Sequence, residues 1–333
     1  MKIAIVILNW NGKELLQQFL PTVIQFSQGS EIYVADNAST DDSVAFVANH
    51  FPSVHIIKNK HNGGFAGGYN EALQQVDADL YCLLNSDVEV TENWLTPVLD
   101  FFKTHPEVVI AQPKILDYKN KEYFEYAGAA GGFIDQLGYP FCRGRVFQTL
   151  EKDEGQYDDI TEVFWATGAC MFVKSTVFHE LHGFDEDYFA HQEEIDFCWR
   201  AKNKGYKVFY IGTSKIYHVG GATLHNMNPK KTFLNFRNSL FSITKNLPLT
   251  KVFVLVFFRL ILDGIAGVRF LYQLKFQHLK AIIRAHFSFY KNFRKMYTKR
   301  SRGVKKEKYY CTTSVVLSYF VFKKKCFYQL LKD

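Results

Sequence analysis

The N-terminal stretch MKIAIVILNWNGKE, residues 1–14, decides the fold. Lys2 to Leu8 is an unbroken apolar, β-rich run of seven residues, and the turn Asn9-Trp10-Asn11-Gly12 follows it. A helical pattern then extends from Lys13 to Phe26. The apolar run is too short for the usual layout of a signal peptide and lacks a small-residue cleavage site, so we expect a buried strand. On this basis we expect the protein to stay in the cytoplasm.

The same order of strand, polar turn and helix recurs along the first 90 residues. Further strands are predicted at Glu31–Ala35, Val54–Lys58 and Leu80–Leu84, and helices at Ser43–His50 and from a Gly-rich turn through Tyr69 and Ala72. Short apolar strands that alternate with helices predict a parallel sheet covered on both faces. Ligands of such sheets bind beyond the carboxyl ends of the strands, where the polar turns lie.

The rest of the first 220 residues predicts a mixed continuation. Residues 108–173 resemble further strands with loops, including a flexible stretch at Glu151–Asp159. Helical spacing returns at Glu193–Lys204, and two short strands are predicted at Lys207–Ile211 and Lys215–His218.

Charge divides the chain into two parts. Residues 230–333 hold 23 Lys and Arg against three acids, a net charge of +20. The totals of 40 basic and 33 acidic residues leave 17 and 30 in residues 1–229, a net charge of −13. An acidic part can surround a metal and a polar substrate, whereas a basic part favours a polyanion, either an anionic membrane surface or nucleic acid. Interleaved Phe and Leu favour lipid, so we expect no nucleic-acid partner.

Residues 251–274 are strongly apolar, but charged and amide side chains interrupt them. On a helical wheel these polar residues occupy one arc of roughly a third of the circumference; they are Lys251, Arg259, Asp263, Arg269 and Gln273. Such a helix suits the membrane interface better than a span across the membrane. A helix packed on the rest of the protein explains the pattern equally well, and both interpretations stay open. The tail at residues 309–331 is a candidate second interfacial element.

Composition excludes several classes of protein. Hydrophobic residues make up 47% and charged residues 22% of the chain, which excludes wholesale disorder. The six cysteines are widely spaced, with no CxxC pair and no His at zinc-finger spacing, so neither a zinc site nor a disulfide framework is expected.

Asp87, two residues after Asn85 at the end of a predicted strand, can present a carboxylate to a divalent cation that bridges two phosphates. Alone, this N-x-D spacing is equally typical of a solvated turn. Other motifs surround it in a definite order: Asn9-Trp10-Asn11-Gly12, Asp36-Asn37-Ala38-Ser39, Asn62-x-Gly64-Phe65-Ala66-x-Gly68-x-Asn70, Asn85-Ser86-Asp87, Asp185-Glu186-Asp187-Tyr188-Phe189 and Glu193-Glu194-x-Asp196-x-Cys198-x-Arg200. Over about Lys2 to Pro248 the ordered set resembles the family 2 glycosyltransferases, in particular a bacterial rhamnosyltransferase-like branch.

The resemblance implies a GT-A fold, a Rossmann-like mixed α/β sheet with helices on both faces, in residues 1–248. Residues 249–333 would form a basic amphipathic region that associates with a membrane. It implies an inverting, metal-dependent transfer of a sugar from dTDP-rhamnose or a UDP-sugar to a saccharide acceptor in cell-surface polysaccharide assembly. The alternative is a non-catalytic nucleotide-sugar-binding protein or membrane scaffold on the same fold.

The resemblance also assigns roles to the donor side. Asp36 would accept hydrogen bonds from the nucleotide base, since a carboxylate suits a pyrimidine N–H. The remaining donor-binding residues would line the base, ribose and diphosphate; they are Asn9, Asn11, Asn37, Ser39, Gly64, Asn70 and Asn85. The glycines near position 64 do not match G-x-G-x-x-G, which argues against a dinucleotide-binding dehydrogenase.

Metal and catalytic roles follow in the same way. Asp87 and His218 would hold Mg²⁺ or Mn²⁺. An inverting transfer needs a carboxylate to take the proton of the acceptor hydroxyl. Relatives often carry Glu-Asp where this chain has Glu193-Glu194, and Glu194 is our candidate base with Glu193 as its rival. A solvated acid pair at the start of a helix is the alternative.

Trp165 and Gly168 resemble the acceptor-side loop of the family, where the aromatic ring could stack on a sugar; a core position for Trp165 is the alternative. The expected partners are a nucleotide-sugar donor, a lipid-linked saccharide acceptor and an anionic membrane surface. The expected location is peripheral, at the inner face of the cell membrane.

Overall fold

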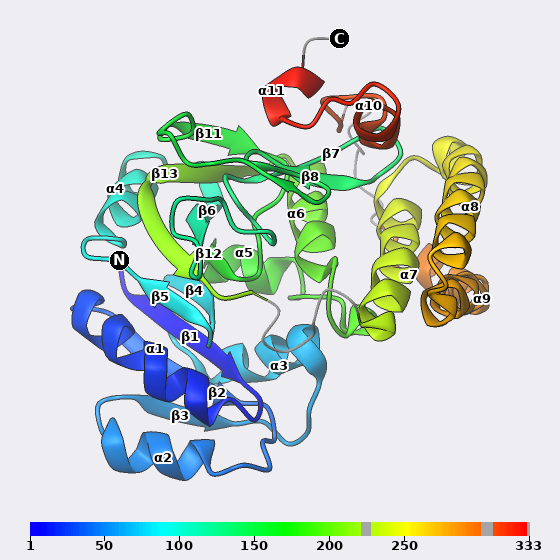
Figure 1. The fold of residues 1–333 in the computed structure, drawn as a ribbon. Coiled ribbons are helices and arrows are strands. Elements are labelled where there is room, and N and C mark those ends of the chain that lie inside the picture. The colour runs from blue at the N-terminus through cyan, green and yellow to red at the C-terminus, as the bar shows by residue number, and fades with distance from the viewer. Residues whose placement is uncertain (221–227, 301–308, 332–333) are drawn as a thin grey trace.

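The structure is a computed structural model that describes residues 1–220, 228–300 and 309–331 (Figure 1). Gly221, which follows the predicted His218 motif, and the basic residues at 302–308 lie outside the described residues. The first part of the chain alternates strands and helices: β1 (Ile3–Asn9), α1 (Lys13–Phe26), β2 (Glu31–Asp36), α2 (Ser43–His50), β3 (His55–Lys58), α3 (Gly64–Ala72), η1 (Leu73–Gln75), β4 (Leu80–Asn85), β5 (Val88–Val90) and α4 (Thr96–Thr104).

The middle of the chain adds more strands, two helices and a 3₁₀ turn. These are β6 (Val108–Asp117), β7 (Gly132–Ile134), β8 (Pro140–Cys142), β9 (Arg145–Val146), β10 (Thr149–Leu150), β11 (Ile160–Val163), β12 (Cys170–Lys174), α5 (Ser175–Glu180), η2 (Glu186–Tyr188), α6 (Glu193–Asn203) and β13 (Lys207–His218). The C-terminal part is helical in its described residues: α7 (Pro229–Asn246), α8 (Leu249–Tyr272), α9 (Phe276–Thr298), α10 (Val315–Phe320) and α11 (Phe327–Leu330).

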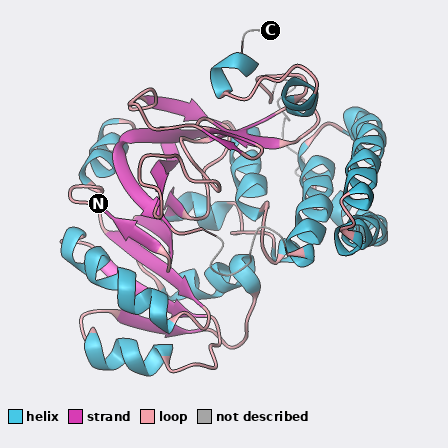
Figure 2. Cartoon of the chain, viewed as in Figure 1, coloured by secondary structure: helices cyan, strands magenta, loops and turns pink. Residues whose placement is uncertain are grey.

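The main sheet is mixed (Figure 2). Its strand order is β11-β13-β6-β12-β4-β1-β2-β3, and β5 pairs with β13. The pairs β4-β1, β1-β2 and β2-β3 are parallel, whereas β12 is antiparallel to both β4 and β6. The expected GT-A type of sheet is confirmed, and β4, β1 and β2 end at one edge, as parallel strands require.

The two faces of the sheet are covered by different helices because side chains alternate along each strand. In β1, Ile5 and Ile7 pack into the cluster that contains Leu16 of α1. Val6 points to the opposite cluster, which contains Tyr69 of α3 and residues of α6 and α7. The unbroken apolar sequence of β1 therefore reflects burial on both sides.

Two predictions of the middle region need correction. The strands predicted at 207–211 and 215–218 form one strand, β13, whose register against β6 shifts between Ile211 and Lys215. The stretch predicted to be flexible at 151–159 is fixed to β6, because the buried Lys114 forms ion pairs with Asp153 and Asp158.

The region after residue 248 shares the core of the preceding part. Phe327 of α11 contacts Phe133 and Phe141 of the small sheet β10-β9-β8-β7, and Phe289 of α9 contacts Phe241 of α7. The predicted division of the chain at residue 248, into a catalytic domain and a membrane-associating region, therefore stays a prediction about function. Within residues 1–220, 228–300 and 309–331, no helix is long and apolar enough to cross a membrane.

Candidate active site

Polar side chains converge where β1 and β2 end. Asn9, the last residue of β1, donates from Nδ2 to Ser43 Oγ at 3.0 Å, to Ser39 Oγ at 3.3 Å and to Asp36 Oδ1 at 3.4 Å. Asp36 Oδ2 in turn accepts from the backbone N–H of Ser39 at 3.1 Å. The structure thus brings together three of the residues that are predicted to bind the nucleotide-sugar donor. Neighbouring protein groups hold the carboxylate of Asp36 in place.

Asn11 and Asn37 organise the loops around this cluster. Asn11 has a φ of 51° and accepts the backbone N–H of Thr40 at Oδ1, which closes the turn after β1 onto the turn after β2. Asn37 donates to the carbonyl of Gly64 at 2.9 Å, and Asn59 donates to the carbonyl of Gly68 at 2.9 Å. These buried amides tie the end of β2 to the Gly-rich turn.

Atoms of the 184–189 loop fill the space next to the N-terminus of α3. Gly64 has a φ of +69°, and a Cβ there would lie 2.3 Å from the carbonyl oxygen of Phe189. That carbonyl accepts the N–H of Phe65 at 2.8 Å. Asn70, predicted to face the donor, instead bonds Phe184 through both amide atoms and donates to Glu186 Oε1. Gly64 and Asn70 therefore join the Gly-rich turn to the 184–189 loop in this structure.

Asp87 and His218 meet as predicted. Asp87 follows β4 and His218 ends β13, and His218 Nε2 lies 3.1 Å from Asp87 Oδ1 and 3.3 Å from Asn85 Nδ2. On the other side of the ring, His218 Nδ1 lies 3.4 Å from Glu125 Oε2. Burial lowers the pKa of His218, but the charges of Glu125 and Asp87 outweigh it and raise that pKa to about 10.

Burial alone would raise the pKa of Asp87, but the neighbouring His218 overcomes this and lowers it. Among the described residues, no group of three or more His, Cys, Asp or Glu side chains could hold a metal. Asp87 and His218 are thus two neighbouring candidate ligands, and a cation there would need the remaining ligands from water and substrate phosphates.

The acid pair begins α6. Glu193 is buried, Glu194 retains partial exposure, and the Oε2 atom of each is buried without a hydrogen-bond partner. Burial raises the pKa of Glu194 to about 7. Burial, reinforced by the charge of Glu194, raises the pKa of Glu193 well above its ordinary value. Of the two carboxyls, Glu194 is the more exposed.

The loop before the acid pair has a strained backbone. Phe189, His191 and Gln192 have φ values of 65°, 68° and 74°, a region that side chains other than glycine rarely adopt. The buried amide of Asn238 in α7 donates to the carbonyls of Tyr188, Ala190 and His191 at 3.0, 3.0 and 2.7 Å. This clamp holds the loop in a conformation that it would not adopt alone.

A buried ion network fixes α6 itself. Asp196 Oδ2 accepts from Arg200 Nε and from Lys245 Nζ of α7, each at 2.8 Å, and Asp196 Oδ1 accepts from Asn246 at 2.8 Å. Burial opposes ionisation, but Lys245 and Arg200 hold the pKa of Asp196 well below its usual range. Asp196 and Arg200 thus form an ion pair four residues apart on α6, and α7 supplies Lys245 as a further partner of Asp196.

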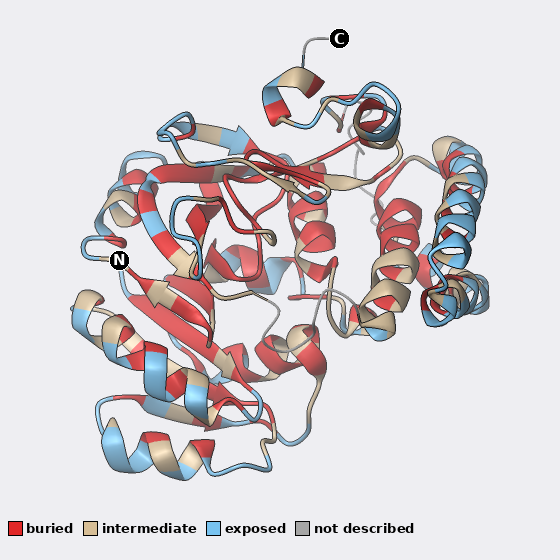
Figure 3. Cartoon of the chain, in the orientation of Figure 1, coloured by how far each residue is buried: buried red, intermediate tan, exposed pale blue. Residues whose placement is uncertain are grey.

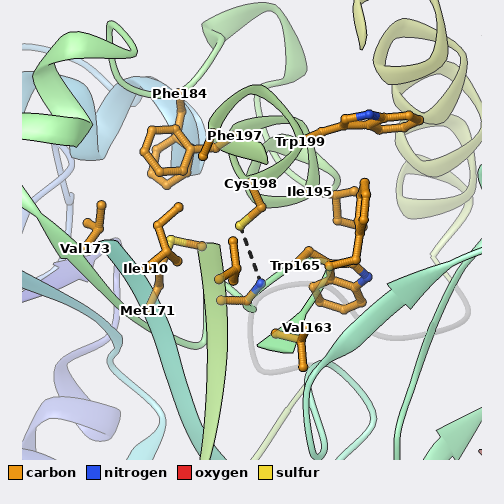
Figure 4. Packing of buried hydrophobic residues seen from close by; sticks show 14 of the residues in the cluster. Ile110, Val163, Trp165, Met171, Val173, Phe184, Ile195, Phe197, Cys198 and Trp199 are labelled. Atoms are coloured by element: carbon orange, nitrogen blue, oxygen red, sulfur yellow. Dashed lines mark hydrogen bonds between the residues drawn. The ribbon is translucent and has the colours of Figure 1, made fainter. Parts of the chain in front are cut away.

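Trp165 lies in the core rather than on an open surface (Figure 4). Its side chain is 2% exposed, and its Nε1 donates to the carbonyl of Phe133 at 3.0 Å. Gly168 has no room for a side chain, because a Cβ would lie 2.6 Å from Phe65 Cζ. Trp165 thus has no exposed ring face on which a sugar could stack in this structure.

Sequence reasoning missed two buried charges, Glu125 and Arg145. Glu125 faces His218, and Arg145 donates to Cys142 Sγ at 3.3 Å. Burial raises the pKa of the Cys142 thiol, with Arg145 opposing and Glu125 and Glu194 adding to the effect. No periodicity or motif in the 122–146 segment indicates this placement.

The structure thus has polar side chains at the carboxyl ends of parallel strands, a carboxylate–imidazole pair at Asp87 and His218, and a carboxyl of raised pKa at the start of α6. The model of a known family, Glycosyl transferase family 2, matches residues 4–180, more than half of the chain. The chain belongs to this family. The match includes Asp36 and Asp87, while the acid pair and His218 of this family 2 glycosyltransferase lie beyond it.

Relatives of this family 2 glycosyltransferase include rhamnosyltransferases. It is 24% identical over 232 residues to an N-acetylglucosaminyl-diphospho-decaprenol L-rhamnosyltransferase of Mycobacterium tuberculosis, covering 65% of this chain and 75% of the relative. It is 23% identical to the rhamnosyltransferase WbbL of Escherichia coli K12, covering 65% and 83%. The resemblance to a rhamnosyltransferase-like branch is thereby supported at low identity.

A solved structure supports the fold. The structure of GalNAc-T7 with UDP, GalNAc and Mn²⁺ matches this family 2 glycosyltransferase with a TM-score of 0.59 at 15% identity. The match covers 75% of this chain and 49% of that chain, so it spans about half of the GalNAc-T7 structure. At this identity the likeness establishes the GT-A fold alone.

Proposed function

We propose that this glycosyltransferase moves a sugar, with inversion, from a pyrimidine nucleotide sugar to a lipid-linked saccharide. The enzyme would build cell-surface polysaccharide at the inner face of the cell membrane. The observations that carry the reaction are, on one side, the contact of His218 with Asp87 at the ends of β13 and β4 and, on the other, the partly exposed Glu194 carboxyl of raised pKa at the start of α6. One side can neutralise a leaving diphosphate while the other accepts a proton, and an inverting transfer needs both.

Asp87 and His218 fit a divalent cation, Mg²⁺ or Mn²⁺. The Asp87 carboxylate is a hard oxygen ligand, and the ring of His218 turns Nε2 toward the same place. Because the neighbouring carboxylates keep this ring protonated at neutral pH without a metal, a cation would have to displace the Nε2 proton in order to bind there. Glu125 on the Nδ1 side suits the carboxylate that often orients a ligating histidine. A bound cation would offset the charge of the departing nucleoside diphosphate. The solved relative with UDP and Mn²⁺ is consistent with this chemistry.

Glu194 is assigned as general base and would take the proton of the acceptor hydroxyl as its oxygen attacks the anomeric carbon. The pKa of about 7 suits this role, because a base with a pKa near the working pH combines sufficient ionisation with sufficient basicity. We keep Glu194 ahead of Glu193 because Glu194 retains partial exposure, whereas Glu193 is buried.

The donor would bind over the cluster of Asn9, Asp36 and Ser39, with the base against Asp36. The sugar is proposed to be rhamnose from dTDP-rhamnose, with a UDP-sugar as the alternative, because relatives include two rhamnosyltransferases. The acceptor is proposed to be lipid-linked because one relative is named for a decaprenol-linked saccharide.

The first test separates an enzyme from a nucleotide-sugar-binding scaffold on the same fold. Nucleotide sugars are screened with Mn²⁺ by thermal shift, since a ligand that binds only the native state raises the unfolding midpoint. Release of nucleoside diphosphate is then measured with the best donor, without acceptor. A shift without any release would favour the scaffold.

The second test concerns the metal. We expect Asp87→Ala to abolish turnover and to weaken Mn²⁺ binding measured by electron paramagnetic resonance. Asp117→Ala serves as the control, since this carboxylate bonds only local backbone N–H groups. Normal turnover and normal Mn²⁺ binding by Asp87→Ala would sink the assignment.

A further inference from the structure

Helix α8 packs on the protein through its charged side. Arg259 and Asp263 are 2% and 1% exposed. Arg259 donates from Nη2 to Ser239 Oγ of α7 at 2.7 Å and lies over the ring of Tyr139. Tyr139 donates its hydroxyl to Asp263 Oδ1 at 3.0 Å, and His286 Nε2 of α9 lies 3.0 Å from Asp263 Oδ2. The central residues of the polar arc, Arg259 and Asp263, therefore face inward, whereas Arg269 and Gln273 at its C-terminal end are exposed.

The outward side of α8 is exposed (Figure 3), and most of its exposed side chains are apolar. Its exposed side chains include Phe253, Val254, Phe257, Phe258, Leu260, Ile261, Ile265, Val268, Leu271 and Tyr272. The three phenylalanines are 60%, 59% and 50% exposed, which at about 200 Å² per ring leaves roughly 300 Å² of their surface in contact with solvent. With the aliphatic residues, this face exceeds the few hundred Å² that a soluble monomer typically exposes.

Basic side chains surround this apolar face without acidic ones. Helix α9 lies beside α8 at one end of the molecule (Figure 1) and exposes Lys280, Arg284, Lys291 and Arg294. Helix α8 adds the exposed Arg269 at its C-terminal end. Between residues 249 and 300 the only acid is Asp263, which is buried. The exposed surface of the two helices is therefore apolar and cationic.

The apolar face continues beyond α8. The guanidinium of Arg269 lies 5.1 Å from the ring centroid of Phe320 in α10. Phe320, Val321 and Phe322 are exposed there and precede Lys323. The tail expected to form a second interfacial element thus lies next to the first.

We propose that the outward face of α8, with the basic rim on α9 and the aromatic residues at 320–322, inserts into the interface of an anionic lipid bilayer. Apolar side chains would enter the acyl boundary while Lys and Arg contact lipid phosphates. The inference specifies which surface of the proposed enzyme contacts the membrane. It rests on the proposed function only for the identity of the acceptor.

Charge favours lipid over a second copy of the chain. A two-fold interface places the same patch on both subunits, so it would bring two cationic rims together without an acidic partner. An anionic bilayer supplies the opposite charge and an apolar interior at once. Since no described helix can cross a membrane, the contact is interfacial.

The membrane face is connected to the catalytic loop through two successive residues of α7. Asn238 holds the carbonyls of the strained 188–191 loop, and Ser239 accepts the hydrogen bond of Arg259. Lys230, near the start of the same helix, lies 4.8 Å from the ring of Phe189. Helix α7 thus connects the proposed lipid-binding face to the loop before the acid pair. The length of this connection would set the distance of the candidate active site from the bilayer surface.

The test is co-sedimentation of the full chain with phosphatidylcholine vesicles, with and without phosphatidylglycerol, in the absence of donor and acceptor. We expect wild type to bind the anionic vesicles. A triple variant, Phe253→Ser, Phe257→Ser and Phe258→Ser, should lower the partition coefficient on the order of a hundredfold or more, because each aromatic burial is lost. Ile160→Ser, an exposed apolar residue on β11, is the matched control for Phe257→Ser.

A second variant tests the rim. Lys280→Gln, Arg284→Gln and Lys291→Gln together should remove most of the preference for anionic vesicles and most of the salt sensitivity of binding. Thermal midpoints and donor hydrolysis in solution should stay near wild type, since these side chains lie outside the candidate active site. If wild type binds anionic vesicles but does not hydrolyse the nucleotide-sugar donor, this result would count against the proposed function and not against the membrane contact.

Two results would overturn the inference. One is wild-type binding by the triple Phe variant, or no binding to anionic vesicles by wild type. The other is a wild-type dimer in sedimentation velocity that the triple Phe variant converts to a monomer, which would assign the face to a second copy.

Discussion

Replacing Glu194 with Gln is expected to stabilise the protein at alkaline pH while removing most of its activity. Folding buries this carboxyl and raises its pKa from an ordinary 4.5 to about 7. The folded state therefore prefers the neutral form. The stabilising contribution of Glu194 is complete below about pH 4.5 and is lost as the pH rises through about 7.

The size of the effect follows from these values. The interval from 4.5 to about 7 corresponds to about 3 kcal/mol at about 1.4 kcal/mol per pH unit. Because Glu194 retains partial exposure, solvent screening reduces this to about 1–3 kcal/mol. Gln has nearly the same shape and never ionises. At pH 8 Glu194→Gln should thus unfold with a free energy about 1–3 kcal/mol above wild type, and at pH 4 the two should agree within about 0.5 kcal/mol.

The assay is urea unfolding at pH 4 and pH 8, paired with nucleoside diphosphate release. Turnover by Glu194→Gln should fall about 10²- to 10⁴-fold, the usual contribution of a general base. Wild-type turnover should rise with pH through about 7, as Glu194 ionises. Glu92→Gln, which replaces an exposed carboxylate in a turn, should change stability by less than about 0.5 kcal/mol at either pH.

The reasoning is refuted if Glu194→Gln gains no stability between pH 4 and pH 8, or if it keeps wild-type turnover. Full activity in Glu194→Gln together with an inactive Glu193→Gln would assign the base to Glu193.

Two further predictions concern the supports of the acid pair. Asn238→Ala leaves three carbonyls of the strained loop without their donor, so we expect a loss of about 1–3 kcal/mol in urea unfolding and a fall in kcat at nearly constant donor KM; an unchanged kcat would remove the positioning role. Lys245→Met leaves Asp185 and Asp196 without a buried cation, which should cost about 3–5 kcal/mol at pH 7. Because the pKa of Asp196 is depressed, this loss should shrink as the pH falls below about 4, and a loss independent of pH would contradict the ion network as its cause.

Much of the first half of the fold could be predicted because its signals are local. The helices at Lys13–Phe26 and Ser43–His50 have the predicted bounds, and the buried strands β1 and β4 are apolar without interruption. The meeting of Asp87 and His218 was predicted from family motifs, since 131 residues separate them and no spacing could indicate it.

Other features depend on distant partners. A helical wheel identified the charged arc of α8 but not the side that it faces. That side is set by Tyr139, which lies 124 residues from Asp263, and by Ser239 on α7. Glu125 and Arg145 likewise gain their roles only because the chain returns to His218 and Cys142. The interpretation of residues 251–274 as a helix packed on the rest of the protein is confirmed, and contact of this helix with a membrane stays a prediction.

The position of β12 has a consequence for biosynthesis. This strand, Cys170–Lys174, lies between β4 and β6, although both are made more than fifty residues earlier. A nascent or truncated chain that stops before residue 170 therefore holds the β4-β1-β2-β3 part of the sheet with an unpaired β4 edge, and β6 without β12 or β13; such edges are prone to pair with other chains. The sheet is completed only when β12 pairs with β4 and β6, and this step should be slow because the paired residues are far apart in the sequence. Any fragment intended to bind donor alone must extend beyond Lys174, even though Asp36 and Asp87 lie far upstream.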